Sequence, residues 1–239
     1  MKILVCIPAL YNGVVLEECL SHLVNRPNVD ILILDNGADG DVKLVLHNYE
    51  IKYGIKVWHS MTNEFVNRPW NDFIRHFLNS THYDHLCIMN SDLYLQEDWA
   101  DILQKRWTID SNEVLSPHII DDKTMMEKPI GKEPTKADVL ETGPPGVFIT
   151  LNRMQAKLVY PLPFDIVKIW FGDTYIYDLL RADGYHVLAP INFLAFHHWS
   201  TTLERLPLRD KLLEQDKQAW ETLGKERLQQ TIQKLKQHG

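Results

Sequence analysis

The amino-acid sequence predicts an α/β fold with a mixed, mostly parallel central sheet that is flanked by helices on both faces. Short apolar runs alternate with longer segments whose apolar residues recur at helical spacing. When strands and helices alternate, each helix connects two parallel strands and packs on a face of the sheet. Helices therefore cover both faces of a mostly parallel sheet. The chain has 239 residues, of which 45% are hydrophobic and 24% are charged, and this composition is ordinary for a globular domain with a real core.

The first half of the chain contains four pairs of a strand and a helix. The first run, MKILVCIPAL, also resembles a short signal peptide, but its β-branched composition and the lack of a clean cleavage site favour a strand. Asp35-Asn36-Gly37 is a turn signal that ends the second strand. The expected strands are residues 2–10, 29–37, 55–60 and 85–95, and the expected helices are residues 12–26, 41–54, 69–81 and 97–109.

The second half is less regular. Residues 121–146 are rich in Pro, Gly, Lys and Glu and are expected to form a long loop, the first part of which is a candidate lid. A strand and a helix are expected over residues 147–159, and a helix, a stop at Gly184 and a strand over residues 171–191. The composition of residues 206–239 predicts a helical tail with a break at Gly224, so we expect a domain over residues 1–204 and a tail over 205–239.

Charge and cysteine content exclude several classes of protein. The net charge is −7 without a basic stripe, which argues against nucleic-acid binding. The three cysteines have no CxxC spacing, so we expect buried thiols in a reducing, cytoplasmic compartment rather than disulfides or a zinc site. No apolar run reaches the length of a membrane span. The mixed charge of the tail favours packing on its own domain over docking on a partner or a membrane surface.

Polar signatures fall at the carboxyl ends of three of the expected strands. They are the segment of residues 8–12, Asp35-Asn36-Gly37 and Asn90-Ser91-Asp92. Ligands of parallel α/β sheets bind outside the carboxyl ends of the strands. Carboxylates that converge at this edge therefore indicate a site for a cation or a sugar nucleotide.

Three further positions are candidates for chemistry. Asp92 is either a ligand of a hard divalent cation or a residue that caps a helix or forms an Asx turn. Asp173 is either a general base or an N-cap. The side chains of His197 and His198 point to opposite faces if they lie in a strand, so at most one of them faces a site.

Taken in order, these elements resemble the family 2 glycosyltransferases. ILVCIPALYNGVVLEECLSHL resembles their opening strand and helix, DILILDNGADGD their second strand, and MNSDLYLQEDW stands in the place of their DxD motif. FGDTYIYDLLRADGYHVLAP resembles the element that carries their base, and FHHWSTT their closing histidine element. Asn63 and Asn71 keep the separation of an NxGxAxxxN element whose Gly and Ala are absent here. The resemblance covers about residues 2–202.

The resemblance implies a GT-A, Rossmann-like fold and an inverting glycosyltransferase that is assisted by Mn²⁺ or Mg²⁺. Asp173 would be the catalytic base. The donor is expected to be a nucleotide-sugar, with a UDP-sugar favoured over dTDP- and GDP-sugars, and the acceptor a hydroxyl of a glycan, a lipid-linked sugar or a protein. The implied donor-binding residues are Pro8, Ala9, Tyr11, Asp35, Asn36, Asn63, Asn71, Asn90 and Ser91, the acceptor-binding residues Trp170, Phe171 and Gly172, and the metal-binding residues Asp92, His197 and His198.

Two departures from the family pattern leave other functions open. Asn90 replaces the first acidic residue of the DxD motif, and Gly172 the first residue of the acidic pair at the base. One alternative is an inactive module that binds a nucleotide or a carbohydrate. The other is a sugar-nucleotidyltransferase, although PALYNGVVLEE lacks the basic residue with which that class grips a triphosphate.

Overall fold

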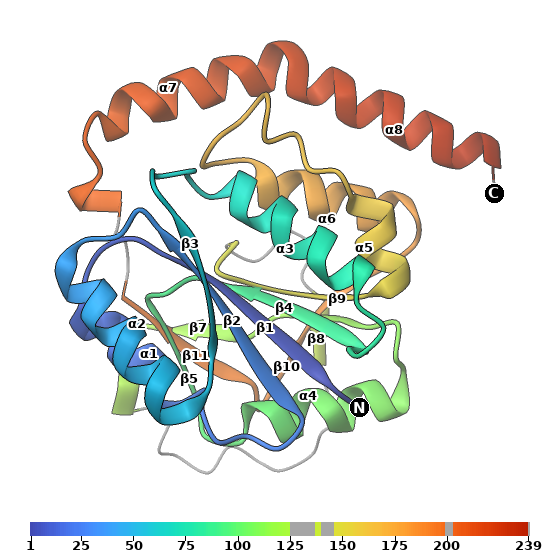
Figure 1. Ribbon diagram of the computed structural model, residues 1–239. Coiled ribbons are helices and arrows are strands. Elements are labelled where there is room, and N and C mark those ends of the chain that lie inside the picture. The colour runs from blue at the N-terminus through green and yellow to red at the C-terminus, as the bar shows by residue number, and fades with distance from the viewer. Residues whose placement is uncertain (125–136, 140–145, 199–202, 239) are drawn as a thin grey trace.

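A five-stranded sheet forms the centre of the molecule in the computed structural model (Figure 1). The structure describes residues 1–124, 137–139, 146–198 and 203–238. The strand order is β3-β2-β1-β4-β9; the first four strands are parallel, and β9 pairs antiparallel with β4. This confirms the predicted mixed, mostly parallel sheet. The strands are β1 (Ile3–Ala9), β2 (Val29–Asn36), β3 (Lys56–Ser60), β4 (His85–Met89) and β9 (Phe148–Asn152).

Helices cover both faces of this sheet because successive side chains of each strand point to opposite faces. Ile3, Val5 and Ile7 pack in one apolar cluster with α1, α2 and α4. Leu4 and Cys6 pack in a second cluster with α3, α5 and α6. The helices are α1 (Gly13–Ser21), α2 (Gly40–Tyr53), α3 (Asn67–Asn79), α4 (Trp99–Ile109), α5 (Arg153–Val159) and α6 (Gly172–Ala182). All three cysteines are buried free thiols, as predicted.

Local signals explain where several helices begin and end. Asp39 caps α2 by accepting the N–H of Val42 at 3.1 Å, and Gly54 ends it in the left-handed conformation. Asn152 and Gln155 form a capping box at the start of α5. The expected helices therefore begin close to the observed ones, although the helix expected over residues 12–26 already ends at Ser21.

The expected strand over residues 85–95, which runs into a turn, is found over its first part, but a second strand follows the turn. The segment is divided into β4 and β5 (Leu93–Leu95), with Asn90, Ser91 and Asp92 in the link between them. β5 leaves the central sheet and joins a three-stranded sheet of order β5-β11-β7, formed with β11 (Leu194–His197) and β7 (His118–Ile120). This division places the polar link at the carboxyl edge of the central sheet.

Part of the expected loop over residues 121–146 is a strand. β8 (Ala137–Val139) pairs antiparallel with β10 (Val187–Pro190), which also pairs with β6 (Val114–Leu115). Residues 125–136 and 140–145 lie outside the described part of the chain, so most of the candidate lid does too.

The C-terminal segment forms one long helical rod, and the predicted break at Gly224 is wrong. A short 3-10 turn, η2 (Leu203–Arg205), leads into α7 (Arg209–Ala219), a π-helical turn η3 (Trp220–Gly224) and α8 (Lys225–His238). The ring of Trp220 lies so close to Gly224 that an added Cβ would stand 2.3 Å from Trp220 Cε3. The glycine therefore permits a close approach and does not end the helix.

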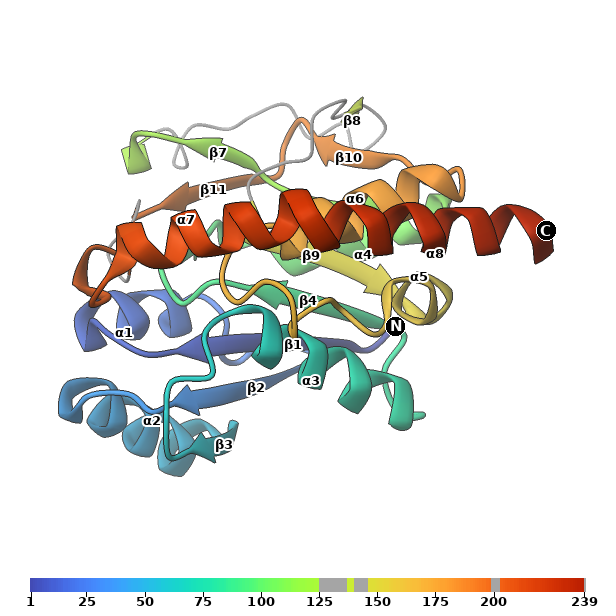
Figure 2. The ribbon, with the colours of Figure 1, turned by 90° about the horizontal axis from the view of Figure 1, so that it is seen from above.

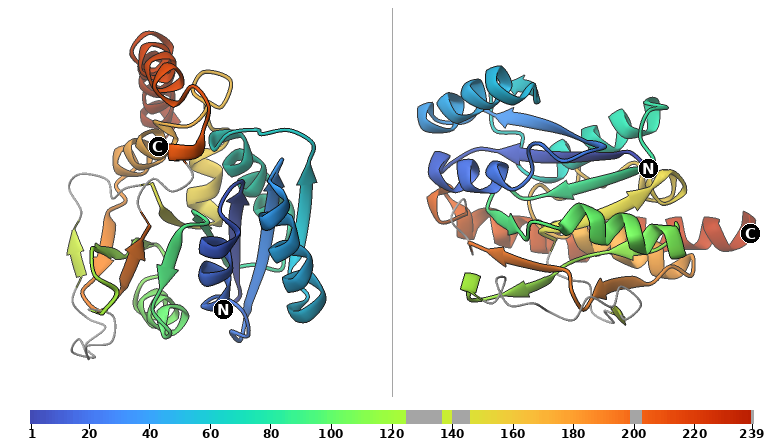
Figure 3. Two further views of the ribbon diagram at one scale, coloured as in Figure 1. Left: turned by 90° about the vertical axis from the view of Figure 1, so that its left-hand side faces the viewer. Right: turned by 90° about the horizontal axis from the view of Figure 1, so that it is seen from below.

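The rod lies against the face of the body that carries α6. Figure 2 shows it crossing the body, with its C-terminal end projecting beyond, and in the right-hand view of Figure 3 it lies behind the sheet while α4 lies in front. Trp220 and Leu228 are buried in the same apolar cluster as α3, α5 and α6. Across the described residues, no helix is both long and apolar enough to span a membrane.

Candidate functional site

A cavity of about 350 Å³ opens at the carboxyl edge of the central sheet. The ends of β1, β2 and β4 reach it, which is where parallel α/β sheets bind ligands. Nine of the predicted site residues meet here: Pro8, Asn36, Asn63, Asn90, Ser91, Asp92, Trp170, Asp173 and His197. Gly146, from the end of the expected loop over residues 121–146, lines it too.

Asp92 and His197 form a buried pair in this cavity. His197 Nε2 lies 3.1 Å from Asp92 Oδ1, and the two side chains are only 6% and 8% exposed respectively. The pairing of β5 with β11 brings them together, and the backbone N–H of His198 donates to the carbonyl of Asp92 at 3.0 Å. Asp92 does not cap α4, since that helix begins at Trp99.

The two neighbouring histidines face opposite sides, as the strand geometry predicts. His198 Nε2 lies 3.0 Å from Glu18 Oε2, and Lys123 forms an ion pair with the same carboxylate. Only His197 lines the cavity, so His198 lies outside the metal site that the sequence suggested.

Asp173 is the second carboxylate of the cavity. It lies in the first turn of α6, where the helix dipole favours a negative charge. Its Oδ2 accepts the N–H of Gly146 at 3.1 Å, and its Oδ1 accepts the N–H of Thr174 at 2.8 Å. Burial raises the pKa of this carboxyl above its ordinary value, while the two N–H groups counteract the shift.

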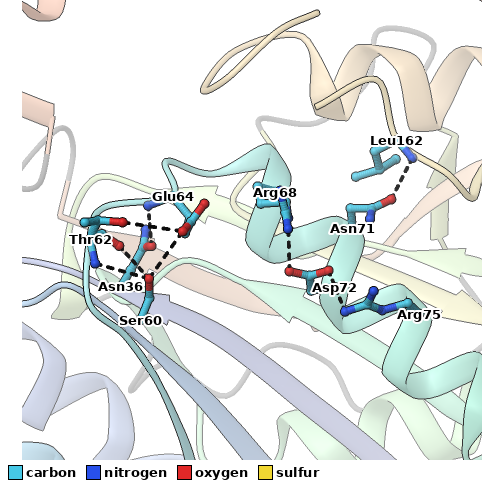
Figure 4. A network of polar contacts seen from close by, with 9 residues as sticks. All are labelled: Asn36, Ser60, Thr62, Glu64, Arg68, Asn71, Asp72, Arg75 and Leu162. Carbon is cyan, nitrogen blue, oxygen red and sulfur yellow. Dashed lines mark hydrogen bonds and ion pairs between the residues drawn. The ribbon is translucent and has the colours of Figure 1, made fainter. Parts of the chain in front are cut away.

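Asn36 holds the turn that forms one wall of the cavity (Figure 4). Its Nδ2 donates to Asn63 Oδ1 at 3.1 Å and to the carbonyl of Phe65 at 2.7 Å, and its Oδ1 accepts the N–H of Glu64 at 2.8 Å. Three bonds from one amide hold Asn63, Glu64 and Phe65 in place. Asn36 therefore shapes this wall and also lines the cavity itself.

Four residues predicted to bind the donor lie outside this cavity. Ala9 is fully buried in the core, and Tyr11, two residues further on, is half-buried. Asp35 faces a second cavity, where its Oδ1 accepts the N–H of Ala38 at 2.8 Å and its Oδ2 lies 3.1 Å from His59 Nδ1. Asn71 is buried in α3 and accepts the N–H of Leu162 at 3.0 Å (Figure 4). Strand and helix periodicity turns the side chains of Ala9, Asp35 and Asn71 away from the cavity.

Two residues expected to contact the acceptor have structural roles instead. Phe171 adopts a left-handed backbone with a φ of 64° and stacks on Trp220 at a ring distance of 5.4 Å. Gly172 passes the side chain of Asn67 so closely that an added Cβ would lie 2.1 Å from Asn67 Oδ1. Of the three predicted residues, only Trp170 lines the cavity.

Gly172→Ala is expected to destabilise the fold by about 1–3 kcal/mol, the usual cost of forcing an extra carbon into a packed site. Gly40→Ala is the matched control, because it also lies at the start of a helix and an added Cβ would meet nothing within 4 Å. Urea unfolding of both variants measures the difference. Equal stability of the two variants would contradict the close approach of Asn67.

Sequence reasoning missed the apolar wall of the cavity. Leu10 follows β1, whereas Leu206 comes from beyond the expected domain boundary at residue 204. No motif marks these positions, because apolar residues look the same in a core and in a cavity wall. The missed residues are Leu10, Phe65, Val66, Trp70, Val147, Ile169 and Leu206.

The charge of the cavity suits a divalent cation more than a free anion. Asp92 and Asp173 are carboxylates, and no Lys or Arg is among the described residues that line the cavity. Asp92 and His197 offer one carboxylate and one imidazole, a donor set that fits Mn²⁺ or Mg²⁺ when a ligand supplies further oxygens. No cluster of three or more His, Cys, Asp and Glu suited to a metal occurs among the described residues.

A model of the family described as Glycosyl transferase family 2 matches residues 4–139 of the chain. No curated protein sequence matches this chain.

Several solved structures share its fold at low sequence identity. S. aureus TarS 1–349 in complex with UDP-GlcNAc is 15% identical with a TM-score of 0.62, over 97% of this chain and 70% of that one. The mannosyltransferase PcManGT from Pyrobaculum calidifontis, in complex with GDP-Man and Mn²⁺, is 12% identical with a TM-score of 0.60, over 97% and 72%. GalNAc-T7 with UDP, GalNAc and Mn²⁺ is 14% identical with a TM-score of 0.61, and the match covers 82% of this chain but only 43% of that one. These likenesses confirm the predicted GT-A fold.

Proposed function

Since this chain belongs to glycosyl transferase family 2, we propose that it transfers a sugar from a nucleoside-diphosphate donor to an acceptor hydroxyl, with inversion at the anomeric carbon. The observation that carries this proposal is the convergence of the Asp92–His197 pair and Asp173 on one cavity at the carboxyl edge of the sheet. The cavity volume of about 350 Å³ is in the range of small-molecule sites.

Asp92 and His197 would hold a divalent cation against the donor diphosphate. A diphosphate is an anion, and the carboxylates of this cavity would repel it unless a cation lies between them. When bound, Mn²⁺ or Mg²⁺ stabilises the negative charge that grows on the leaving diphosphate. The complexes of the similar structures with GDP-Man and Mn²⁺ and with UDP, GalNAc and Mn²⁺ support this choice of ion.

The remaining donor contacts are assigned to the wall formed by the strand ends. Asn63 uses its carbonyl oxygen to accept bonds from Asn36 and from the N–H of Phe65, so we assign its NH₂ group as a donor to the nucleotide. Pro8 and Leu10 supply an apolar surface for the base. A UDP-sugar remains the favoured donor, as the complex of the similar TarS structure with UDP-GlcNAc supports.

Asp173 would act as the general base. The acceptor oxygen attacks the anomeric carbon while the bond from that carbon to the diphosphate oxygen breaks, and the acceptor proton passes to the Asp173 carboxylate. Burial and the N–H groups of Gly146 and Thr174 fix this carboxylate at the cavity wall. Trp170 is half-buried beside it and offers a ring face on which an acceptor sugar can pack.

A thermal-shift panel tests this function. UDP, GDP, dTDP and CMP, with their common sugars, are each added with Mn²⁺, Mg²⁺ or EDTA. One nucleoside diphosphate is expected to raise the melting temperature only with metal, because a ligand at 100 times its Kd stabilises the fold by about 2.7 kcal/mol. The absence of any metal-dependent shift would contradict the donor site. A shift without any turnover would instead indicate an inactive binding module.

A further inference from the structure

The segment that carries Trp170 into the cavity is fastened to the C-terminal helix by one carboxylate. We call residues 166–172 the strap. Asp216 on α7 is only 3% exposed, and its Oδ2 accepts the N–H groups of Lys168, Ile169 and Trp170 at 3.1, 2.7 and 3.1 Å. Its Oδ1 accepts the N–H of Lys168 as well, at 3.0 Å. A single side chain thus satisfies three consecutive backbone donors that no strand or helix pairs.

The opposite side of the strap is held by the start of α3. Asn67 is fully buried, and its Nδ2 donates to the carbonyls of Val167 and Trp170, at 3.0 Å in each case. The backbone N–H groups of Val66 and Asn67 both donate to the carbonyl of Lys168, at 3.1 and 2.9 Å. The strap is therefore clamped between α3, which belongs to the body, and α7, which belongs to the C-terminal rod.

Two further contacts connect the C-terminal segment to the residues around the cavity. Trp220 stacks on Phe171 with an angle of 6° between the rings, immediately before α6 begins with Gly172 and Asp173. Leu206, which precedes α7, lines the cavity with Ile169 and Trp170. The rod thus contributes a stacking partner and the carboxylate that holds the strap, and the link that leads into it contributes a wall residue.

We propose that Asp216 is a positioning residue for the acceptor side of the site, and that the C-terminal rod is a working part of that site. By fixing three N–H groups of the strap, Asp216 sets the position of the Trp170 ring and of the Asp173 carboxylate at the end of the strap. This inference rests on the proposed role of the cavity. Misplacement of a reacting group by about 1 Å can cost roughly 10²-fold in rate, so such a clamp has a large effect on transfer.

The test compares Asp216→Asn with Arg227→Gln. Arg227 also ties the rod to the body, through two bonds to Asp165 at 2.6 and 3.0 Å, but it does not touch the strap's N–H groups. The readout is the pKa of Asp173, measured by ¹³C NMR titration of its carboxyl carbon, which is assigned by its loss in Asp173→Asn. We expect the pKa to fall toward the ordinary value in Asp216→Asn as the strap loosens and water reaches Asp173. It should stay as in the wild type in Arg227→Gln and largely recover in Asp216→Glu.

An unchanged Asp173 titration in a folded Asp216→Asn protein would overturn the inference. A second measurement needs no variant. In native-state hydrogen exchange of the wild type, the amides of Lys168, Ile169 and Trp170 are expected to open together with those of α7. Fast exchange of these three amides while α7 stays protected would overturn the inference too.

The donor site is tested separately from the strap. Stabilisation by UDP or GDP with Mn²⁺ is expected to be equal in the wild type, Asp216→Asn and Arg227→Gln, because the donor wall does not include the strap's N–H groups. If neither nucleotide stabilises the wild type, the proposed function fails while the Asp173 titration still reports on the clamp. If Asp216→Asn changes neither nucleotide binding nor the titration of Asp173, the positioning role of Asp216 fails while the proposed donor site stands.

Discussion

Asp173→Asn is expected to reduce sugar transfer by roughly 10²–10⁴-fold, the usual contribution of a general base. The substitution keeps the size of the side chain and an oxygen that can accept one of the N–H bonds from Gly146 and Thr174. It removes the ability to take a proton from the acceptor hydroxyl. Donor binding is expected to persist, because the proposed cation ligands lie elsewhere in the cavity. Single-turnover assays of transfer and thermal shifts with the nucleotide measure the two effects separately.

Asp178→Asn is the matched control for this loss. Asp178 lies on the same helix, but it pairs with Arg181 at the surface, at 3.3 Å, and does not line the cavity. Its substitution is expected to change transfer less than twofold. If both variants lose activity equally, the effect comes from helix α6 as a whole and not from a base at Asp173.

The pH dependence of transfer should follow the same carboxyl. Burial raises the pKa of Asp173 in the folded protein, so the group becomes a competent base only above the ordinary aspartate value of about 3.9. The activity is therefore expected to fall on the acid side with an apparent pKa above that value. Stability depends on pH in the opposite direction: the raised pKa favours folding of the protonated form, and this contribution is lost as the pH rises through the folded pKa. Asp173 is thus a site at which function costs some stability.

Asp92→Asn is expected to remove most of the metal-dependent stabilisation by the nucleotide. Asp92 supplies the carboxylate of the proposed cation site, and an amide is a weaker ligand for a hard cation. A 100-fold loss of affinity would reduce a stabilisation of about 2.7 kcal/mol to about 0.4 kcal/mol at the same ligand concentration. Thermal shifts with and without Mn²⁺ measure this change.

Asp35→Asn provides the matched control for Asp92→Asn. Asp35 is also a buried aspartate at the end of a strand, but it faces the second cavity, where it bonds to Ala38 and His59. The rise in melting temperature that the nucleotide causes in Asp35→Asn, measured against the same variant without nucleotide, is expected to match that of the wild type. A loss of the shift in this variant alone would restore the donor-binding role that the sequence suggested for Asp35.

The elements that depend on local patterns could be predicted from the sequence. The apolar runs of β1, β2 and β4 and the capping signals at Asp39 and Gly54 act within a few residues, so their outcome follows from the chain itself. Parallel strands end at the same edge of a sheet, so the strand ends could also predict that Asn90, Ser91 and Asp92 lie at the ligand-binding edge.

Features that depend on contacts distant in sequence could not be predicted. The choice between His197 and His198 is set by the register of β11 against β5, which the sequence does not reveal. The left-handed Phe171 and the close approach of Gly172 follow from packing against Trp220 and Asn67. The role of the C-terminal rod depends on Asp216, whose partners lie more than forty positions away along the chain.

In the proposed reaction, the cavity cleaves a nucleotide-sugar by direct displacement, with Asp173 as base. The most direct test follows the anomeric proton by time-resolved ¹H NMR while the protein, with Mn²⁺, turns over the donor that the thermal-shift panel identifies. Water and simple glycosides serve as acceptors. We predict that an α-linked donor first yields a β-configured product and that Asp173→Asn yields almost none. A product of retained configuration, or a bound donor that is never cleaved under conditions of full occupancy, would contradict the account.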